Sequence, residues 1–490
     1  MNLYAMLADS IRRHAGKVAV SHGDRTLTYA ELDRVASDTA AFYESLGCRR
    51  GDRVLLFLKN GFEYPALLLA AIRAGMVAVP VNAKLHPREV AWICGDATPR
   101  VVVAHGDAIE PVRAALPEGC APHFIAIEAF SPPETSATIA PPADVAPDDP
   151  AWLFYTSGTT GKPKGAVLTH RNLIAATVNC LADMFDFRAD DCVLHVAPLS
   201  HGSGLYLIPS LARGAHNIIS DRPGFQPDEA LDIVAERGVT VLGFVAPTMI
   251  VRLLEAAPRD DIGTLRGVIY GGATIHLEHI RAAVSRFGPI FHQLYGQGEA
   301  PMTISYLPAA DHAGADDETL LSAGYPRAGV EVRIVGDDDA EGEICVRGDV
   351  VMKGYWGNPE ATEKALRDGW LHTGDIGRFD AKGRLRVLDR RHDTIISGGA
   401  NIYPKEIEDV IAGHPAVSEV IAFGVPDPEW GESVAVAVVA SGEVSEGDLL
   451  AFCRESLASF KKPKRIIFLD ELPKSAYGKV LRRELKARFG

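Results

Sequence analysis

The sequence lacks the features that would make it a nucleic-acid binder or a disulfide-stabilised protein. Its formal net charge is −14, whereas a general nucleic-acid binder needs a basic face that neutralises phosphates. The seven cysteines are scattered, without a C-x-x-C pair or a histidine-rich companion segment, so neither a zinc site nor a disulfide framework is indicated. We therefore expect no nucleic-acid partner and a reducing compartment, the cytoplasm.

Long hydrophobic runs are also missing. The most apolar helical stretch, Tyr64 to Ile72, is far shorter than the roughly 20 residues that cross a bilayer. Residues 1–17 lack the basic start, apolar core and small-residue cleavage site of a secretory signal, and they have the pattern of a first helix. The sequence thus predicts no integral membrane segment.

The composition present is that of a globular protein with a sizeable core. The chain has 490 residues, of which 47% are hydrophobic and 23% charged, so we expect two or more domains. From Lys17 to about His105, β-rich runs alternate with helical ones, which indicates parallel β-α units. Thr28 and Glu31 form a capping-box pattern before the first long helix.

The sequence pattern changes four times after this first run. A proline-rich stretch, residues 131–150, reads as an exposed connector, and a second α/β run follows it. Short strands and turns begin beyond Ser322, and the last hundred residues have the pattern of a compact α+β unit. The predicted fold class is α/β. Residues 1–389 form a large region of α/β subdomains with a small β-rich subdomain, and residues 390–490 form a small α+β domain.

The stretch "YTSGTTGKPKG", residues 155–165, is suited to binding phosphate. The familiar nucleotide loop G-x-x-x-x-G-K-[ST] does not fit it, because Pro163 stands where that loop needs Ser or Thr. Its glycines let backbone N–H groups approach an anion, while hydroxyls add donors and lysines add positive charge. The candidate phosphate ligands are Thr156, Ser157, Gly158, Thr159, Thr160, Gly161, Lys162 and Lys164.

Further motifs occur in a fixed order along nearly the whole chain. After the phosphate stretch come "APLSHGSGL", "YGGAT", "YGQGEAP", "HTGDIGRFD", "DRRHDTIISGGANIYPKEIE" and "PKSAYGKVLRREL". In this the chain resembles the AMP-forming adenylating superfamily, which contains acyl-CoA and aryl-CoA synthetases, adenylation domains of peptide synthetases and luciferases. The resemblance implies that the phosphate stretch holds the pyrophosphate end of ATP and that the C-terminal domain is mobile.

The chemistry of such enzymes defines which residues matter. A carboxylic acid with a pKa near 4 is already ionised at neutral pH, so no general base is needed for its attack on the α-phosphate of ATP. The need is for cationic and metal stabilisation of the phosphate charge. The resemblance assigns Mg²⁺ to Glu299 and the α-phosphate to Lys479. It assigns the ribose hydroxyls to Asp375, and a ribose and phosphate contact to Arg390.

An adenine slot is implied by two glycine-containing motifs. The resemblance places the base between an aromatic face and flat backbone, formed by Gly271, Gly272, Ala273, Tyr295, Gly296 and Gln297. One position departs from the family pattern, which usually has Thr before the metal-binding Glu and here has Gly298. We interpret Gly298 as leaving room beside the acyl site.

The acceptor and acyl sites rest on the same resemblance. Ser397, Gly398 and Gly399 match the loop beside the pantetheine tunnel, and His392 stands at the position of the hinge. His201 matches the residue that gates the acyl tunnel, and Gly202, Gly204 and Gly298 predict a roomy pocket for the acid. Fatty acids and aryl or arylpropenoic acids both fit this pattern.

The sequence therefore predicts an AMP-forming carboxylate–CoA ligase that uses ATP, Mg²⁺ and coenzyme A on a small carboxylic acid. One alternative is a free-standing adenylating enzyme that loads a carrier-protein thiol. A second is a degenerate adenylate-binding protein without activity. Association into a homodimer is compatible with each of the three.

Overall fold

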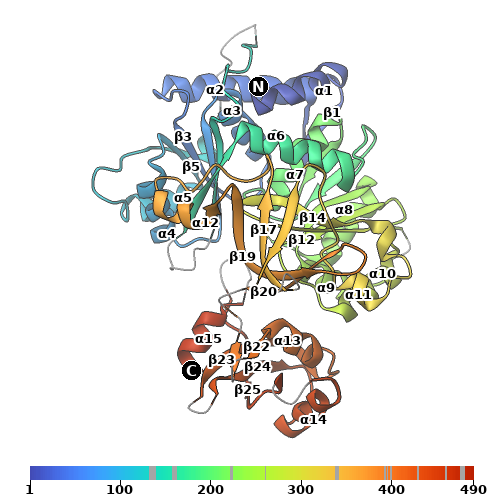
Figure 1. Cartoon of the computed structure of the whole chain (residues 1–490). Coiled ribbons are helices and arrows are strands. Elements are labelled where there is room, and N and C mark those ends of the chain that lie inside the picture. The colour runs from blue at the N-terminus through green and yellow to red at the C-terminus, as the bar shows by residue number, and fades with distance from the viewer. Residues whose placement is uncertain are drawn as a thin grey trace.

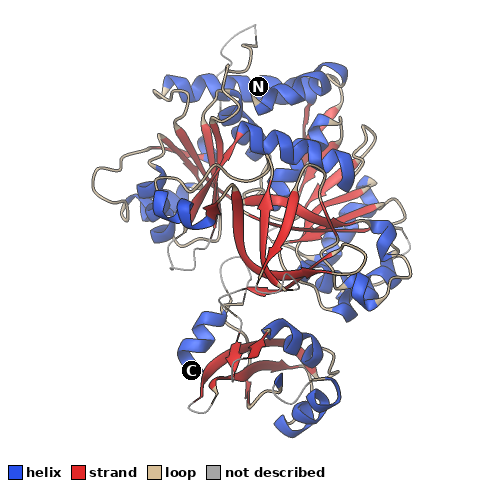
Figure 2. Ribbon diagram, viewed as in Figure 1, coloured by secondary structure: helices blue, strands red, loops and turns tan. Residues whose placement is uncertain are grey.

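The structure is a computed structural model, and it describes most of the chain. The described residues are 1–131, 139–156, 163–220, 224–259, 261–336, 341–390, 393, 395–397, 400–427, 430–457, 461–474 and 480–490. A large N-terminal part contains three sheets with helices around them, and a smaller part with its own sheet lies below it in Figure 1. The predicted α/β class, with a large and a small part, is confirmed (Figure 2).

The first α/β run forms a six-stranded sheet in the order β6-β5-β3-β4-β7-β8. Its neighbours are parallel except for the β7–β8 pair. Helix α3 is buried on every side, as its almost wholly apolar sequence requires. The strands are β3 (Arg53–Leu58), β4 (Val77–Asn82), β5 (Val101–Ala104), β6 (His123–Ala126), β7 (Pro150–Thr156) and β8 (Lys164–Thr169); the helices are α3 (Tyr64–Arg73), α4 (Pro87–Ala97), α5 (Gly106–Arg113) and the short η2 (Ile127–Ala129).

The second α/β run forms most of a nine-stranded sheet in the order β15-β14-β13-β12-β11-β9-β10-β1-β2. The strands are β1 (Val18–His22), β2 (Arg25–Thr28), β9 (Cys192–His195), β10 (His216–Ile219), β11 (Val241–Val245), β12 (Gly267–Gly271), β13 (Phe291–Gln297), β14 (Ala300–Leu307) and β15 (Tyr325–Pro326). The helices of this region are α6 (His170–Asn179), η3 (Cys180–Met184), α7 (Gly202–Ala212), α8 (Pro227–Arg237), α9 (Pro247–Glu255), α10 (Leu277–Phe287), η4 (Ala309–His312) and α11 (Asp317–Leu320).

The place of β1 differs from the expected β-α alternation. Strand β1 pairs with β10 in the nine-stranded sheet, far along the sequence, and not with β3. It is followed directly by a tight antiparallel hairpin to β2, which turns between His22 and Arg25. Because a hairpin cannot make the crossover that a parallel neighbour needs, β1 does not begin a β-α unit of the first sheet.

The N-terminal helices lie along one end of the large part (Figure 1). They are η1 (Leu3–Leu7), α1 (Ala8–Arg13) and α2 (Tyr29–Ser45). The capping box predicted from Thr28 and Glu31 is confirmed, since the Thr28 side chain accepts from the Glu31 N–H and Glu31 accepts from the Thr28 N–H. This reciprocal cap fixes the start of α2, whose apolar face joins the main core.

The expected exposed connector packs against the large part over the portion that can be described. Residues 139–149 form no helix or strand, but Val145 is 5% exposed. The Asn2 Nδ2 donates to the Ala143 carbonyl at 3.1 Å, and the Ala143 N–H donates to the Arg73 carbonyl. The connector is therefore partly buried here, because its backbone groups find partners near the end of α3.

The β-rich subdomain and the small C-terminal part follow the predicted pattern. The subdomain is an antiparallel sheet of β16 (Glu331–Val335), β17 (Gly342–Arg347), β18 (Leu366–Arg367), β19 (Trp370–Phe379) and β20 (Leu385–Arg390), with α12 (Pro359–Ala365). The small part contains β21 (Ile395–Ser397), β22 (Ala400–Ile402), β23 (Val417–Asp427), β24 (Gly431–Ala440) and β25 (Arg465–Phe468), with helices α13 (Pro404–Ala412), α14 (Glu446–Ser456) and α15 (Arg482–Phe489).

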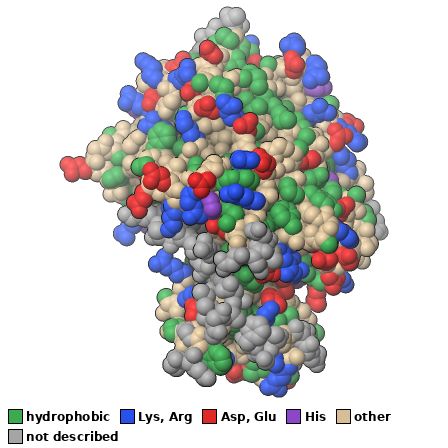
Figure 3. Space-filling view, in the orientation of Figure 1, with side chains coloured by type: hydrophobic (Ala, Val, Ile, Leu, Met, Phe, Trp, Pro, Cys, Tyr) green, Lys and Arg blue, Asp and Glu red, His purple; other side chains and the backbone are tan. Residues whose placement is uncertain are grey.

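A polar contact joins the two parts between α13 and the start of α10. The Nδ1 of His276 lies 3.1 Å from the Asp409 carboxylate, and Lys405 pairs with the same carboxylate. Elsewhere the visible surface is of mixed charge, with acidic and basic side chains interspersed over the face shown in Figure 3. No described helix is both long and apolar enough to cross a membrane.

Two histidines in the large part are fully buried and make the fold sensitive to acid. Burial lowers the pKa of both His170 and His195 to about 4. Each is then neutral in the folded state but takes up a proton near pH 6.5 when unfolded. Their stabilisation is therefore complete above pH 6.5 and is lost as the pH falls below that value.

We expect the free energy of unfolding to fall by about 2 kcal/mol per buried histidine between pH 7 and pH 5. Urea unfolding at the two pH values measures this loss. The His195→Gln variant should lose about 2 kcal/mol less than the parent over the same interval, whatever its stability at pH 7. An equal pH-dependent loss in both proteins would contradict the assignment to His195.

Candidate active site

The ends of the predicted phosphate stretch lie side by side on the edge of the six-stranded sheet. Thr156, the last residue of β7, pairs with Lys164, the first residue of β8. The intervening candidates Ser157, Gly158, Thr159, Thr160, Gly161 and Lys162 lie outside the described residues. The two described ends, Thr156 and Lys164, thus lie at the carboxyl end of β7, and ligands of open α/β sheets bind at such strand ends.

Tyr355 connects these ends to the predicted metal carboxylate. Its hydroxyl donates to Glu299 Oε1 at 2.6 Å, and the Lys164 Nζ lies 5.1 Å from the centre of its ring. Burial and the neighbouring Glu299 carboxylate raise the pKa of Tyr355, so the phenol remains a donor. The sequence did not identify Tyr355, because its position depends on backbone bonds to distant strands, including Trp356 N to the Gly165 carbonyl at 2.8 Å.

Glu299 stands at the tip of the β13–β14 hairpin. Gln297 and Ala300 form the last pair of the two strands, so Gly298 and Glu299 make the turn. The Thr156 hydroxyl approaches Glu299 Oε1 at 3.4 Å. Among the described residues no hydrogen-bond partner occurs for Oε2. A carboxylate with an oxygen available beside a hydroxyl fits Mg²⁺, which prefers hard oxygen ligands.

Asp375 is buried at the place where β19 meets the nine-stranded sheet. It is 5% exposed, and its Oδ2 accepts from the Tyr295 hydroxyl at 2.7 Å and from Gln297 Nε2 at 2.6 Å. Tyr295 and Gln297 both lie on β13, so one strand orients this carboxylate. Asp375 also pairs in register with Arg390 on β20, which brings the Arg390 backbone to the same site; the Arg390 side chain lies outside the described residues.

Glu343 supports the segment that carries Asp375. Its Oε1 accepts from the Gly374 N–H at 3.1 Å, and its Oε2 lies 2.9 Å from His372 Nδ1. With Cys345 these groups could supply three metal-ligating atoms. Their mutual contacts and the Arg367–Glu343 ion pair already satisfy the carboxylate, so we interpret them as supports for the turn. The sequence offered no periodicity that would have identified this role.

The glycines predicted for the adenine slot lie at the ends of β12 and β13. A side chain on Gly271 would come within 2.5 Å of the Leu294 carbonyl, and one on Gly296 within 2.5 Å of the Met302 nitrogen. Gly272 has φ +82°, a left-handed conformation that favours glycine. Gly272 and Ala273 are exposed, so the strand ends offer flat, accessible backbone next to Tyr295.

His201 precedes α7 and packs edge-on against Phe154 on β7. The ring centroids are 5.3 Å apart with an interplanar angle of 80°. The Ser200 hydroxyl lies 2.8 Å from its Nδ1. Burial lowers the pKa of His201 to about 4, so the ring is neutral at physiological pH. An uncharged ring is suited to act as a gate through its size. It is less suited to bind the carboxylate of an acid, which a protonated histidine would attract.

The glycines predicted to enlarge the acyl pocket do not share one environment. A side chain on Gly202 would meet Met302 Cε at 2.1 Å and Phe244 at 3.0 Å, so Gly202 faces side chains beside His201. One on Gly204 would lie 1.9 Å from the Leu199 carbonyl. Gly204 therefore allows two backbone segments to approach, and the expectation that it adds room for an acid is not supported.

The space beside Gly298 is also filled. A side chain there would lie 2.4 Å from the Thr156 methyl and 2.8 Å from Phe154. The idea that Gly298 leaves empty room for the acid is replaced by close packing between the hairpin tip and β7. Thr156 and Phe154 occupy the volume that the usual threonine would take.

The Gly298→Thr variant is therefore expected to lose activity equally for all acids. Overpacking a tight site costs about 1–3 kcal/mol, or roughly 5- to 150-fold in rate. The added methyl would displace Thr156 and the nearby Glu299, which serve every substrate. Measuring kcat/KM for a short and a bulky acid in both proteins tests this. Selective loss of the bulky acid would instead place Gly298 in the acyl pocket.

The predicted acceptor residues belong to the small part of the chain. Ser397 ends β21 and pairs with Ala400 of β22. Gly398, Gly399, the hinge candidate His392 and Lys479 lie outside the described residues. The roles of Ser397, Gly398, Gly399, His392 and Lys479 therefore stay predictions.

Two family models match the chain in the order that the motifs predicted. The model described as AMP-binding enzyme matches residues 7–356, and the model described as AMP-binding enzyme C-terminal domain matches residues 406–479. The first match covers the strands of the six-stranded and nine-stranded sheets and includes Thr156, Lys164, Glu299 and Tyr355, and it ends before Asp375. The chain belongs to the family of AMP-binding enzymes.

Similar proteins indicate which kind of reaction, among those of AMP-binding enzymes, this chain catalyses. A feruloyl-CoA synthase from an Amycolatopsis species is 40% identical over 96% of each chain. The fatty acid–[acyl-carrier-protein] ligase ScoC of Streptomyces coeruleorubidus is 36% identical over 95% of this chain and 92% of its own. The crystal structure of ATP-bound MatB from Rhodopseudomonas palustris is similar with a TM-score of 0.90, at 32% identity over 100% of this chain and 98% of its own. This chain is an AMP-forming acid–thiol ligase.

Proposed function

We propose that the protein activates an aromatic or fatty carboxylic acid with ATP and transfers the acyl group to coenzyme A. The observation that carries the proposal is the segment Tyr295 to Glu299. Tyr295 and Gln297 hold the Asp375 carboxylate, and Glu299 faces Thr156 and Tyr355. Strand β13 and the turn that follows it thus carry residues for both the predicted ribose end and the predicted phosphate end of a nucleotide.

The first step joins the acid to AMP. An oxygen of the substrate carboxylate attacks the α-phosphorus, the bond to the pyrophosphate oxygen breaks, and pyrophosphate leaves. Asp375 would accept hydrogen bonds from the ribose hydroxyls, and Lys164 with the 156–164 stretch would hold the leaving phosphates. Glu299 and Thr156 would hold Mg²⁺, which when bound neutralises phosphate charge. Lys479 would place its ammonium at the α-phosphate.

The second step transfers the acyl group. The thiolate of coenzyme A attacks the carbonyl carbon of the adenylate, and AMP leaves with the bonding electron pair. His201, neutral and packed on Phe154, would separate the acid from the thiol channel until the thiol arrives. Ser397, Gly398 and Gly399 would line that channel after the C-terminal domain, residues 390–490, has turned about His392.

Coenzyme A is the favoured acceptor. The 40% identity to a CoA synthase supports it, and the 36% identity to an acyl-carrier-protein ligase keeps the carrier thiol as the alternative. The cysteines, all within described segments, form no disulfide, which supports a reducing cytoplasm as the location.

A screen of carboxylic acids tests the proposal directly. Each acid is incubated with the protein, ATP, Mg²⁺ and free CoA, and pyrophosphate and CoA thioester are measured. We expect pyrophosphate release and a CoA thioester with at least one acid. Pyrophosphate without thioester would favour the carrier-protein alternative. No pyrophosphate with any acid would favour a degenerate binding protein.

A further inference from the structure

Strand β19 contains a bulge that carries the carboxylate predicted to bind the ribose. Cys345 of β17 pairs with His372, and Glu343 pairs with Ile376. Between these two pairs β17 has one residue, whereas β19 has three, the last of which is Asp375. Bulges of this kind bend a strand and re-aim its side chains, and they are common beside active sites. The shape of the bulge therefore determines where the Asp375 carboxylate lies.

Thr373 fastens the first part of the bulge to the opposite strand. Its hydroxyl donates to the Ile344 carbonyl at 2.7 Å and accepts from the Asp375 N–H at 3.1 Å. The Thr373 carbonyl in turn accepts from Gln297 Nε2 at 3.0 Å. The bulge is thus held both by β17 and by β13.

Glu343 reaches from β17 to the middle of the bulge. Its Oε1 accepts from the Gly374 N–H at 3.1 Å, where Gly374 has a left-handed φ of +72°. Its Oε2 lies 2.9 Å from His372 Nδ1 and 3.4 Å from Arg367 Nη2. The Glu343 residue is only 9% exposed, and these partners fix the orientation of its carboxylate. A charge-assisted hydrogen bond therefore holds the Gly374 peptide, one residue before Asp375.

The contacts of Asp375 divide between its side chain and its backbone. Its Oδ2 accepts from the Tyr295 hydroxyl and from Gln297 Nε2, both on β13. Glu343 acts instead on the backbone of the bulge, from β17. A group that binds a ligand has to be held within about 0.5 Å of its productive position. Loss of the Glu343 contact would keep both donors to the carboxylate but would let the backbone that carries it shift.

We infer that Glu343 is a positioning residue for the nucleotide, and that by holding the bulge it makes the protein select a sugar with both ribose hydroxyls. The inference rests on the proposed function, in which Asp375 accepts hydrogen bonds from these hydroxyls, and it adds a determinant of nucleotide selectivity to it. Glu343 acts through the Gly374 N–H and Asp375, and it is a positioning and not a binding residue.

The test compares the binding of ATP with that of 2′,3′-dideoxy-ATP. The full chain is titrated calorimetrically with each nucleotide in the presence of Mg²⁺ and without an acid. The ratio of the two dissociation constants isolates the ribose hydroxyls, because the nucleotides are otherwise identical. We expect the parent protein to bind ATP at least about 10-fold more tightly, the value of one hydrogen bond to a charged acceptor. The fitted stoichiometry reports the folded fraction, so a loss of folded protein does not change this ratio.

Three replacements of Glu343 separate its reach from its charge. Glu343→Met keeps the length of the side chain and removes both oxygens, and Glu343→Asp keeps the charge but is one methylene shorter. Each should lower the binding ratio by roughly 3- to 10-fold. Glu343→Gln keeps an oxygen for the Gly374 N–H and should retain most of the ratio.

Glu341→Gln is the matched control for these variants. Glu341 lies directly before β17, and it forms a partly exposed ion pair with Arg378 at 2.7 Å. Its replacement removes a carboxylate from the same edge of the sheet without touching the bulge. The binding ratio should remain that of the parent.

A double replacement shows whether Glu343 acts through Asp375. Asp375→Ala removes the acceptor of the hydroxyls, so the two nucleotides should bind nearly equally. Adding Glu343→Met to Asp375→Ala should then leave the ratio unchanged, because contributions that pass through one group are not additive. A further change of the ratio in the double variant would overturn the assignment.

The outcomes separate the inference from the proposed function. Equal binding of the two nucleotides by the parent, or an unchanged ratio in both Glu343→Met and Glu343→Asp, overturns the inference and leaves the ligase activity intact. Failure to release pyrophosphate with any acid overturns the proposed function. The binding ratio still decides the inference in that case, because the titration needs neither an acid nor turnover.

Discussion

Replacing Lys479 with alanine is expected to lower the rate of adenylation by roughly 10²- to 10³-fold, the usual cost of one lost donor to developing charge. The attacking carboxylate and the triphosphate are both anions, so a cation placed between them acts mainly in this first step. Thioester formation from supplied acyl-adenylate should remain largely intact. Pyrophosphate release and thioester formation, measured separately, show whether the loss is confined to one step.

Lys474 provides the matched control for this change. It precedes Lys479 in the same segment, and its Nζ lies 2.8 Å from Glu419 in a partly exposed ion pair. An exposed ion pair contributes little, so Lys474→Ala should retain nearly full activity. Equal loss of both half-reactions in Lys479→Ala would contradict a role limited to adenylation.

Replacing Glu299 with glutamine should reduce adenylation by at least 10- to 100-fold, the range lost when even an outer partner of a metal site is removed. The amide keeps the shape of the side chain and an oxygen for the Tyr355 hydroxyl, but it removes the charge that would hold Mg²⁺. The variant should therefore need a higher Mg²⁺ concentration for half-maximal rate. A magnesium titration of pyrophosphate release measures both effects.

The Glu331→Gln variant is the control, because it removes a carboxylate at a position away from the candidate site. Glu331 forms an exposed ion pair with Arg347 on the β-rich subdomain. Its replacement should change neither the rate nor the magnesium requirement. If Glu299→Gln gave the same magnesium curve as the parent, Glu299 would not be a metal ligand.

Local patterns in the sequence predicted most of the elements. The apolar runs of β3, β4 and β5 and the capping box of α2 are short-range signals, and the structure confirms each one. The sheet to which β1 belongs was not predictable in this way. That choice depends on β10, almost two hundred residues later, and on the tight turn to β2.

The candidate site shows the same limit. Asp375, Glu299 and His201 were identifiable because they stand inside recognisable motifs. Tyr355 and Phe154 were not, since each acts through one contact made across distant segments of the chain. The glycines were identified, but the sequence could not show which neighbours a side chain at each of these positions would meet, because that depends on the backbone geometry. Only the fold could show that Gly298 faces Thr156 while Gly202 faces Met302.

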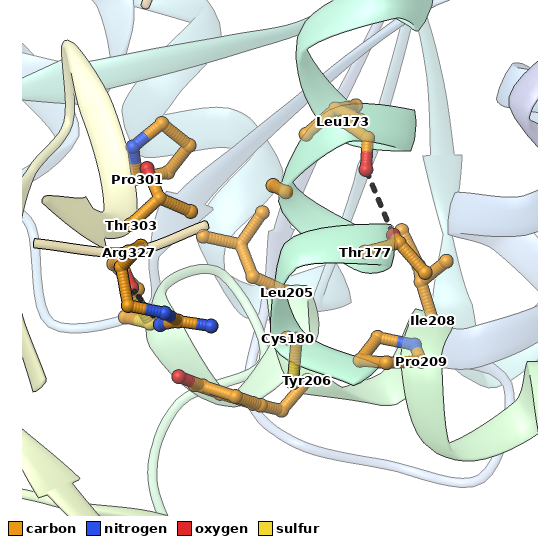
Figure 4. Close-up of a pocket in the computed structure, with 12 residues that line it drawn as sticks. Leu173, Thr177, Cys180, Leu205, Tyr206, Ile208, Pro209, Pro301, Thr303 and Arg327 are labelled. Carbon is orange, nitrogen blue, oxygen red and sulfur yellow. Dashed lines mark hydrogen bonds between the residues drawn. The ribbon is translucent and has the colours of Figure 1, made fainter. Parts of the chain in front are cut away.

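The β13–β14 hairpin assigns two regions of the large part to separate strands. The residues predicted to face the nucleotide come from β13 and the turn, whereas Met302 and Thr303, which line a small pocket against α6 and α7 (Figure 4), come from β14. Substitutions at Met302 or Thr303 can therefore change that pocket while the contacts of Tyr295 and Gln297 with Asp375 stay in place.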